Sequence, residues 1–391
     1  MIRVIFIVIA LLTAWADHRA YRKVSASKLW QRIIYATTLT LLNILPLILL
    51  SITAVAPDNS QTIMSIASWA LTIYTIATLV RISFYLGFLT IKPKKLALIV
   101  GGIFATIVFA TLCNSLINTR TNLKIKRVAI KHASIPKSFD GFRIALFSDL
   151  HIASLISPER EITRLAESIN KQDVDMVIFA GDLLHIRHTE LSAKIASILS
   201  TIKARYGVYT VLGNHDTGVY IKDTLSLTRN ENIAHLNTKI GQIRWTMLRD
   251  STIYAVRGRD SIAVTGIDFT DALLEYKHSF ATPDNYSAES LFSSIPKEMF
   301  NIAVSHLPQL WHPISSGNFA ELTLSGHIHA TQVAAEMFGK RVSPAMLMYK
   351  EWSGLYSKDN NHLYITDGIG SVGFYLRIGA RPELTIIELN R

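Results

Sequence analysis

The sequence contains one cysteine, Cys113, and very little negative charge in its first third. A single cysteine excludes a disulfide within the chain, and its place in an apolar run gives no information on the compartment. Residues 1–118 hold two acidic side chains, Asp17 and Asp58, against ten lysines and arginines, a net charge of +8. The remaining residues have thirty basic and twenty-seven acidic side chains, a net charge of +3. Because most of the excess positive charge flanks apolar segments, we expect a membrane protein and no nucleic-acid partner.

Four apolar segments predict an all-α transmembrane region of about four helices. They are residues 4–16, 33–55, 63–91 and 96–117. The first segment is shorter than the roughly twenty residues that a span needs. It could instead be the apolar part of a signal peptide, with Ala14-Trp15-Ala16 as its cleavage site. Arg81 interrupts the third segment, so that helix would have to tilt, break or extend the guanidinium to an interface.

The positive charges between these segments predict the orientation. Five basic residues lie within residues 17–32 and three within residues 92–95, whereas residues 56–61 have none. The positive-inside rule therefore places residues 17–32 and 92–95 in the cytoplasm and residues 56–61 on the opposite side. Four basic residues close to the last segment favour the opposite orientation, but long domains are translocated largely regardless of such charges. We expect a multi-pass protein of a bacterial inner membrane, with everything after Ile117 in the periplasm or outside the cell.

The residues after the last apolar segment alternate between strand and helix patterns. Apolar runs at 142–147, 176–180 and 207–212 predict strands, and the segments between them predict helices, the first with Ser157 as its N-cap and Pro158 at its first position. This order favours an α/β core with parallel neighbouring strands. Further on, two apolar runs around a Gly-Arg-Asp turn predict a hairpin, so the sheet should be mixed.

Five short polar clusters follow directly after predicted strands. They are Ser148-Asp149-Leu150-His151, Gly181-Asp182, Gly213-Asn214-His215-Asp216, Ser305-His306-Leu307-Pro308 and Gly326-His327-Ile328-His329. Each cluster alone is typical of a turn or of solvated histidines. Together, at the sheet edge where α/β proteins collect binding groups, they offer the carboxylate, amide and imidazole ligands of divalent metals. Two metals roughly 3.5–4 Å apart can hold the attacking and leaving oxygens of a phosphoryl transfer and deprotonate a bridging water.

The order of these clusters resembles the calcineurin-like metallophosphoesterase superfamily. Three further sequences are similar to its membrane-associated bacterial branch, the YkuE/YaeI-like enzymes: Tyr206-Gly207-Val208-Tyr209, Trp352-Ser353-Gly354-Leu355-Tyr356 and Arg381-Pro382-Glu383. The resemblance covers Lys124 to the carboxyl terminus. It implies a two-sheet αββα sandwich in residues 119–391, preceded by the transmembrane region in residues 1–118. It also implies a hydrolase of ester bonds that works by attack of a metal-bridging hydroxide.

The resemblance implies a role for each polar residue of the clusters. One metal would be held by Asp149, His151 and His329. A second would be held by Asn214, His306 and His327, and Asp182 would bridge the two. His215 would stand beside the substrate, where it stabilises the phosphoryl oxygens and protonates the leaving group. The two ions would be divalent, of the Mn, Fe or Zn type.

Two positions depart from the pattern of the family. The superfamily often has an aspartate three residues after the bridging one, where it orients the catalytic histidine. This chain has His185 at that position, so the acid strength of His215 would differ unless Asp216 replaces the missing carboxylate. Members of the branch tend to read GHTHGGQ, whereas this chain has Ala330 and Thr331 at the two glycine positions, which narrows the backbone freedom beside the metals.

All implied ligands are present, so the sequence predicts an active phosphoesterase. Its membrane anchor suggests a phosphoester or pyrophosphate substrate that is a lipid or is lipid-linked. Two other interpretations stay open. A transport protein with a regulatory soluble half is favoured by Arg81 within a span, and a non-catalytic metal-binding sensor is favoured by the two lost glycines.

Overall fold

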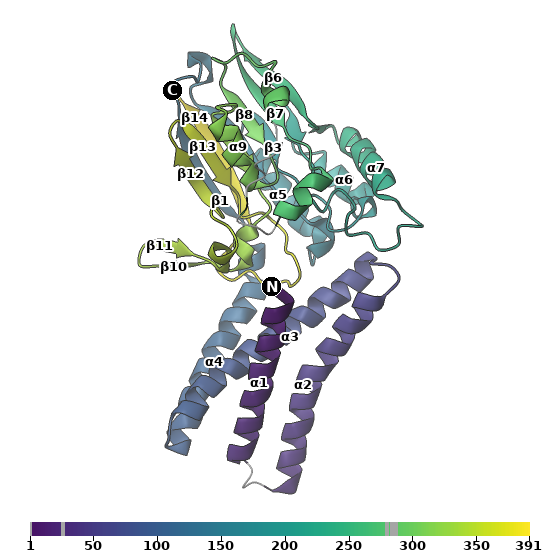
Figure 1. Ribbon diagram of the computed structural model, residues 1–391, viewed down its shortest axis with the longest axis vertical. Coiled ribbons are helices and arrows are strands. Elements are labelled where there is room, and N and C mark those ends of the chain that lie inside the picture. Colours follow the sequence, from purple (N-terminus) through teal and green to yellow (C-terminus); the bar gives the residue numbers. More distant parts are fainter. Residues whose placement is uncertain (1, 25–27, 278–280, 282–287) are drawn as a thin grey trace. The chain divides into compact units, whose positions relative to one another are not determined.

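A computed structural model describes residues 2–24, 28–277, 281 and 288–391 of the chain. The chain forms two compact units (Figure 1). The first comprises Met1–Asn118 and the short segment Gly373–Leu376, and the second comprises Thr119–Val372 and Arg377–Arg391.

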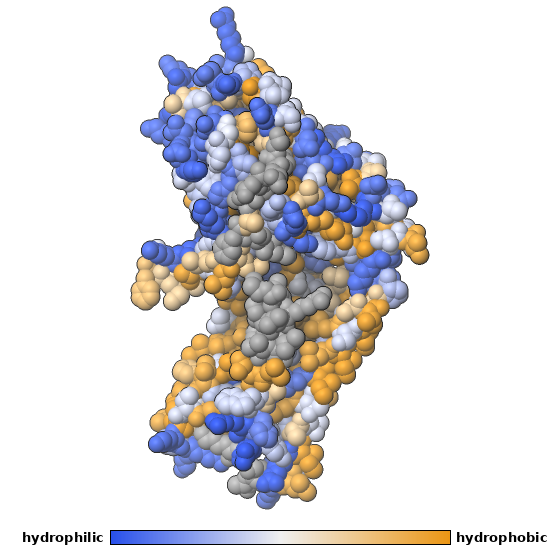
Figure 2. Space-filling view, in the orientation of Figure 1, coloured by the Kyte–Doolittle hydropathy of each residue, from blue (hydrophilic) through white to orange (hydrophobic). Residues whose placement is uncertain are grey.

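The first unit is built from four helices. They are α1 (Ile2–Val24), α2 (Leu29–Val55), α3 (Gln61–Thr90) and α4 (Lys94–Ile117). Among the residues that the structure describes, three helical segments are long and apolar enough to cross a membrane: Leu29–Val55, Gln61–Thr90 and Lys94–Thr121. Many of their leucines and isoleucines are exposed, and Figure 2 shows the surface of this unit largely in the hydrophobic colour. Contact of such an apolar surface with water is unfavourable, whereas contact with lipid chains is not.

A buried polar cluster joins three of these helices. The guanidinium of Arg81 in α3 lies 3.0 Å from Asp17 Oδ2 in α1, and it also donates to Asn43 Oδ1 in α2. Asn43 Nδ2 and the hydroxyl of Tyr85 donate to the two carboxylate oxygens of Asp17. Helix α3 therefore runs unbroken past Arg81, because the charge that was expected to bend it or to reach an interface is neutralised inside the unit. Helix α1 correspondingly continues beyond Asp17, where the charge pattern predicted a loop.

The second unit contains two mixed sheets, as the family resemblance implied, and each has six strands. The first sheet has the order β1-β14-β2-β3-β4-β5, and its strands are β1 (Lys124–Lys131), β14 (Glu383–Asn390), β2 (Phe142–Phe147), β3 (Met176–Phe179), β4 (Val208–Thr210) and β5 (Thr246–Met247). The second has the order β12-β13-β9-β8-β7-β6, and its strands are β12 (Gly354–Lys358), β13 (Asn361–Ile365), β9 (Leu322–Ser325), β8 (Asn301–Val304), β7 (Asp260–Gly266) and β6 (Ser251–Arg257). Strands β2 to β5 are parallel to one another, as are β7, β8, β9 and β13.

The two sheets pack face to face with helices outside them. One apolar cluster contains Ile144 and Ile178 from the first sheet and Val264, Ile302 and Leu324 from the second, so it lies between the sheets. A second cluster combines the other faces of the strands with the helices, which are α5 (Pro158–Asn170), α6 (Ala193–Leu199), α7 (Arg229–Gln242), α8 (Glu289–Phe292) and α9 (Trp311–Ser316). This arrangement confirms the predicted αββα sandwich. The alternation of side chains along each strand produces it, since the two faces of a buried strand need separate apolar partners.

A short hairpin stands apart from both sheets and was not predicted. Strands β10 (Ala335–Met337) and β11 (Lys340–Val342) pair antiparallel around the two-residue turn Phe338-Gly339. Figure 1 shows this hairpin projecting from the sandwich. Its turn is hard to foresee from the residues, because Phe-Gly is not one of the usual turn pairs such as Asn-Gly.

Candidate metal centre

The five polar clusters of the sequence converge at the carboxyl ends of parallel strands. Asp149, Asp182 and Asn214 follow β2, β3 and β4 of the first sheet. His306 follows β8 of the second sheet, and His327 and His329 both follow β9. Parallel strands end at the same edge, so each sheet delivers its polar loops to one place.

The first group of side chains consists of Asp149, His151 and His329. Their potential ligand atoms all lie within 4.8 Å of one another, and all three residues are buried. Asp149 Oδ1 is 3.1 Å from His329 Nε2 and 3.9 Å from His151 Nε2. The two imidazole Nε2 atoms are 3.1 Å apart. One carboxylate and two imidazoles pointing at a common position suit a divalent transition metal.

The second group consists of Asp182, His306 and His327, whose potential ligand atoms also lie within 4.8 Å of one another. Asp182 Oδ2 is 3.1 Å from His306 Nε2 and 3.7 Å from His151 Nε2, a member of the first group. Asp182 therefore faces both groups. A carboxylate in this position can be shared by two cations.

Asn214 contributes an acceptor without a partner. Its side-chain Oδ1 is buried and has no hydrogen-bond partner among the described residues, while its Nδ2 donates to the Tyr220 hydroxyl over 3.0 Å. The tyrosine thus fixes which end of the amide faces the centre. A buried carbonyl oxygen without a donor is costly unless a cation or water meets it, so this atom fits the proposed ligand set.

Backbone carbonyls orient several of the imidazoles. His151 Nδ1 is paired with Leu184 O at 3.1 Å and His306 Nδ1 with Ala180 O at 2.7 Å, which leaves Nε2 of each ring facing the centre. His327 has the reverse arrangement, because its Nε2 is paired with Lys277 O at 2.6 Å. Such outer contacts fix the ring orientation that metal ligands require.

The residues that carry the carboxylates and imidazoles sit in unusual backbone conformations. Asp149, His151, Asp182, His327 and His329 all have positive φ angles, between 42° and 77°. Residues other than glycine rarely adopt this region, and it is concentrated at functional sites. The neighbouring Gly213 is required for another reason: a Cβ there would lie 2.0 Å from Asp182 Oδ1.

The two lost glycines lie in this strained region. Ala330 has φ 48° and ψ 32°, and Thr331 has φ 48° and ψ 25°, both in the left-handed conformation that glycine adopts without strain. Ala330 and Thr331 therefore adopt the left-handed backbone conformation for which glycine is favoured. Part of the compensation is local, because Ser343 Oγ donates to Ala330 O over 2.7 Å and lies 3.1 Å from Thr331 Oγ1.

His215 lies beside the first group, and the two residues expected to influence it are His185 and Asp216. The His215 ring centroid is 4.6 Å from that of His151, and its Nδ1 is 2.6 Å from the backbone oxygen of His185. The His185 ring stacks on His215 with centroids 5.3 Å apart and, with His151, forms a third group of potential ligands. Asp216 faces elsewhere: its carboxylate accepts backbone N–H groups of Asp182, Leu184 and Gly213.

The buried carboxylates of the centre shift the pKa values of the groups around them. Burial raises the pKa of the Asp149 carboxyl, but the imidazoles of His329 and His306 lower it further, so the pKa lies below its usual range. Burial lowers the pKa of His306, and the carboxylates of Asp182 and Asp149 more than reverse this, which raises it to about 9. Burial, reinforced by His306, lowers the pKa of His327 to about 3. Burial raises the pKa of the Asp182 carboxyl, and His306 and His215 lower it further, so both Asp149 and Asp182 favour the anionic form. Burial and the nearby Asp182 raise the pKa of the Asp216 carboxyl to about 7.

Some residues that support the centre carry no signal in the sequence. Arg377 is fully buried, donates to the backbone oxygens of Asp367, Gly370 and Ala380, and lies 3.3 Å from His329 Nδ1. Glu190 accepts the backbone N–H groups of Ala153, His185, Ile186 and Arg187, and so holds the loops of His151 and His185 together. Only the tertiary fold brings these partners together.

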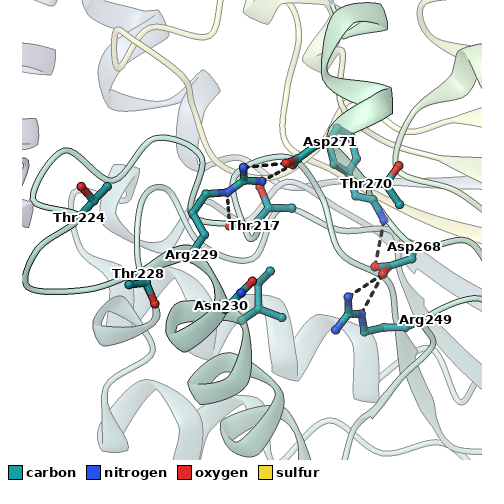
Figure 3. Close-up of a pocket in the computed structure, with 11 residues that line it drawn as sticks. Thr217, Thr224, Thr228, Arg229, Asn230, Arg249, Asp268, Thr270 and Asp271 are labelled. Atoms are coloured by element: carbon teal, nitrogen blue, oxygen red, sulfur yellow. Dashed lines mark hydrogen bonds and ion pairs between the residues drawn. The ribbon is translucent and has the colours of Figure 1, made fainter.

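A pocket of about 480 Å³ opens beside the loop that carries Asn214 and His215 (Figure 3). Thr217 lines it, as does Phe269, whose ring centroid is 6.3 Å from that of His306. Its two arginines, Arg229 and Arg249, are paired with Asp271 and Asp268. The pocket is therefore polar but nearly neutral, and it could hold a polar part of a substrate near the centre.

Comparison with known proteins agrees with this geometry. A family model described as calcineurin-like phosphoesterase matches residues 142–331. The chain is 27% identical over 265 residues to the uncharacterized metallophosphoesterase YkuE of Bacillus subtilis, an alignment that covers 66% of this chain and 83% of YkuE. It is 27% identical over 306 residues to a transmembrane protein with metallophosphoesterase domain of Danio rerio, covering 77% of this chain but only 63% of the fish protein.

A further relative is a named enzyme. The chain is 31% identical over 286 residues to the UDP-2,3-diacylglucosamine pyrophosphatase LpxG of Chlamydia muridarum, an alignment that covers 65% of this chain and 86% of LpxG. The family match extends over β2 to β9 and includes each of the five polar clusters. The chain therefore belongs to the calcineurin-like metallophosphoesterases and is a hydrolase of ester bonds.

Proposed function

We propose that this chain is a membrane-anchored phosphoesterase with two divalent metal ions, which hydrolyses a phosphoester or pyrophosphate in a lipid or lipid-linked substrate. The observation that carries the proposal is Asp182, whose carboxylate faces two separate groups of ligands. Asp149, His151 and His329 would hold one ion, and Asn214, His306 and His327 the other. When bound, ions of the Mn, Fe or Zn type supply Lewis acidity and activate water for attack at phosphorus.

His215 is proposed to be the catalytic residue beside the metals. The backbone oxygen of His185 accepts from its Nδ1, so Nε2 is the atom left to face a substrate. Burial lowers the pKa of this imidazole, and the Asp182 carboxylate and the His185 carbonyl oppose that shift by favouring the imidazolium form. The net effect lowers the pKa of His215, so the anionic phosphoryl group of a bound substrate would have to favour the imidazolium form. In that form His215 would stabilise the charge on the phosphoryl oxygens and donate its Nε2 proton to the leaving oxygen.

His185 and Asp216 are proposed to act through their neighbours. His185 orients His215 with its backbone oxygen and with the face of its ring. The Asp216 carboxylate ties the loop of Asp182 to the loop of His215 through backbone N–H groups. The backbone oxygen of His185 would thus orient His215 without the negative charge that a carboxylate would add, and Asp216 would keep the bridging residue in place.

The lipid part of the proposal rests on two findings. The chain has helices able to span a membrane, and a relative is named as a pyrophosphatase of a diacylated sugar nucleotide. An enzyme anchored in a membrane meets lipid substrates at high local concentration. We further propose that the protein lies in the inner membrane of a bacterium, with its catalytic domain in the periplasm or outside the cell.

The test uses the full chain in detergent and a chromogenic phosphodiester. Hydrolysis should require Mn²⁺, Fe²⁺ or Zn²⁺ and stop with a chelator. Asp182→Ala and His215→Ala should each lower kcat/KM by at least about 100-fold. Asp173→Ala is the matched control, since this side chain is 98% exposed and precedes β3, at the opposite end of that strand from Asp182. Full activity in either site variant would refute the assignment, and metal binding without turnover would favour a sensor.

A further inference from the structure

The hairpin β10–β11 and the loop after it carry a group of exposed apolar side chains, which we call the apolar arm (residues 335–347). Phe338 is fully exposed, Leu347 is 76% exposed, and about half the surface of Met337 and of Met346 is exposed. Figure 2 shows hydrophobic colour at the end of the projecting hairpin. Burial of these side chains would be favourable, and nothing among the described residues of the second unit covers them.

The turn of the hairpin places Phe338 where the backbone disfavours it. Phe338 has φ 52° and Gly339 has φ 73°, so both residues of the turn are left-handed. Asn, Asp or Gly would fit the first position without strain, and a bulky residue there is unusual. Phe338 therefore adopts a strained backbone conformation, and its side chain does not pack against the rest of its domain. A role outside the domain accounts for it.

The two faces of the hairpin differ in chemistry. Residues paired across the strands share a face, so the pairs Ala335–Val342 and Met337–Lys340 lie on one side and the pair Glu336–Arg341 on the other. Three of the four residues on the first side are apolar, and Lys340 is the fourth. Arg341 is held by Asp367 and Ser353, which anchors the polar face to the domain. Met337 and the tip residue Phe338 remain exposed.

The base of the arm is attached to the metal centre. Ser343, which follows β11, donates to the backbone oxygen of Ala330, the residue after His329. Ala334, which precedes β10, donates its N–H to Ile378 O, next to the buried Arg377 that lies beside His329. Whatever holds the arm therefore also fixes the position of the loop that carries His329.

The length of the chain keeps this domain near the bilayer. Helix α4 ends at Ile117 and β1 begins at Lys124. The six residues between them span at most about 22 Å when fully extended. The exposed cation Lys340 lies within the arm, and the exposed Lys350 follows it. Exposed aromatic and aliphatic side chains with lysines beside them are typical of segments that enter the headgroup region of an anionic membrane.

We propose that the apolar arm inserts into the interfacial region of the bilayer that the chain spans, and so holds the metal centre at the level of lipid headgroups. The inference rests on the proposed function, because it specifies how a lipid phosphate would reach that centre. A protein partner fits less well. Four side chains on a convex hairpin offer roughly 500 Å² or less, below the roughly 800 Å² that a stable interface buries on each side.

The experiment uses the full chain in vesicles of phosphatidylethanolamine and phosphatidylglycerol. Cys113 is the only cysteine, so Cys113→Ala gives a background for single labels. An environment-sensitive fluorophore is attached to Phe338→Cys, to Leu347→Cys, or to the control Val256→Cys. Val256 is an apolar residue of β6 with 60% exposure, and Figure 1 shows β6 at the end of the sandwich opposite the hairpin. Both arm sites are exposed, so the substitutions should not disturb folding.

Spin-labelled lipids should quench the two arm labels at least about twofold more than the control label, and aqueous iodide should quench them less. Equal quenching of all three labels would overturn the proposal. So would protection of the arm that appears only when the protein concentration in the vesicles is raised, which would indicate a second copy. The readout needs no turnover, so an inserted arm on a chain inactive toward every phosphate ester would refute the proposed function alone.

Discussion

At the scale of single residues, Asp182 determines the electrostatics of the centre. Its carboxylate lies 3.1 Å from His306 Nε2 and 3.7 Å from His151 Nε2, and its other oxygen accepts the backbone N–H of His215. One side chain therefore couples both groups of ligands to the loop of the proposed catalytic residue. A change at this position should affect metal content and activity together.

Metal binding should release about one proton from His306 at pH 7. Burial lowers the pKa of this imidazole, but Asp182 and Asp149 raise it overall to about 9, so the metal-free protein is protonated there at neutral pH. A ligand imidazole must be neutral, so the apparent metal affinity should rise with pH and level off above about 9. His327, with a pKa of about 3, is already neutral and contributes no proton.

Calorimetry of metal binding in two buffers with different ionisation enthalpies measures this release. His306→Asn should abolish it together with one of the two bound metals. Proton uptake, or a release unchanged in that variant, would contradict the assignment of His306.

Replacement of Thr331 is predicted to change the stability of the second unit. A β-branched side chain at φ 48° is strained, and a left-handed backbone costs about 1–2 kcal/mol for residues other than glycine. Thr331→Gly should therefore stabilise the second unit by about 1 kcal/mol and raise its Tm by about 2–4 °C. Thr331→Ser, which keeps the hydroxyl and the Cβ, is the control and should change little. A lower Tm for the glycine variant would show that the hydroxyl contacts outweigh the strain.

At the scale of secondary-structure elements, the clearest case is the buried polar cluster of the first unit. Asp17 and Arg81 are each at least 90% buried and lie on different helices. A charge left alone in such a place is far more costly than the pair. The ion pair consequently specifies that α1 packs against α3 at this position, although apolar side chains of similar size could pack as tightly.

Asp17→Leu should destabilise the first unit by about 3–5 kcal/mol, because it leaves the Arg81 charge buried without its partner. The double variant Asp17→Leu/Arg81→Leu removes both charges and should recover most of the loss. Reaction of a thiol-specific dye with the half-buried Cys113 in α4, followed on heating the full chain in detergent, reports the unfolding of this unit. Equal stability of the single variant and the parent would exclude a structural role for the pair.

At the scale of the whole molecule, the orientation follows from the charges of the connecting segments. Basic residues within 17–32, which include the end of α1 and the connection to α2, and within 92–95 are predicted to be cytoplasmic. We therefore propose that the phosphoesterase lies on the opposite side of the membrane. Alkaline phosphatase fused after Arg391 should be active in a bacterial host, and a green fluorescent protein at the same position should be dark. The reverse pattern would place the enzyme in the cytoplasm and would direct the search for a substrate to the inner leaflet.

Much of the fold and of the centre could be predicted from the sequence. Short apolar runs ending in Asp149, Asp182, Asn214 or His306 carry two local signals at once, a buried strand and a polar turn. Parallel strands bring such ends to one edge, so the convergence of the clusters could be expected from the order of the runs alone. The hairpin β10–β11 could not, because its turn pair is atypical and its strands have three residues each.

The sequence by itself predicted an α/β core, the apolar helices and the residue types of the candidate metal centre, because periodicity and strand ends are local properties. The two-sheet αββα sandwich was implied by the family resemblance and not by these local patterns. Only the tertiary structure decided which residues far apart in the sequence contact one another in the candidate centre and in the helical unit. Arg377 reaches His329 across 48 positions, and Asp17 meets Arg81 across 64. The carbonyl of His185, rather than the carboxylate of Asp216, orients His215. Such contacts depend on where loops far apart in the chain are packed, and no local pattern records that.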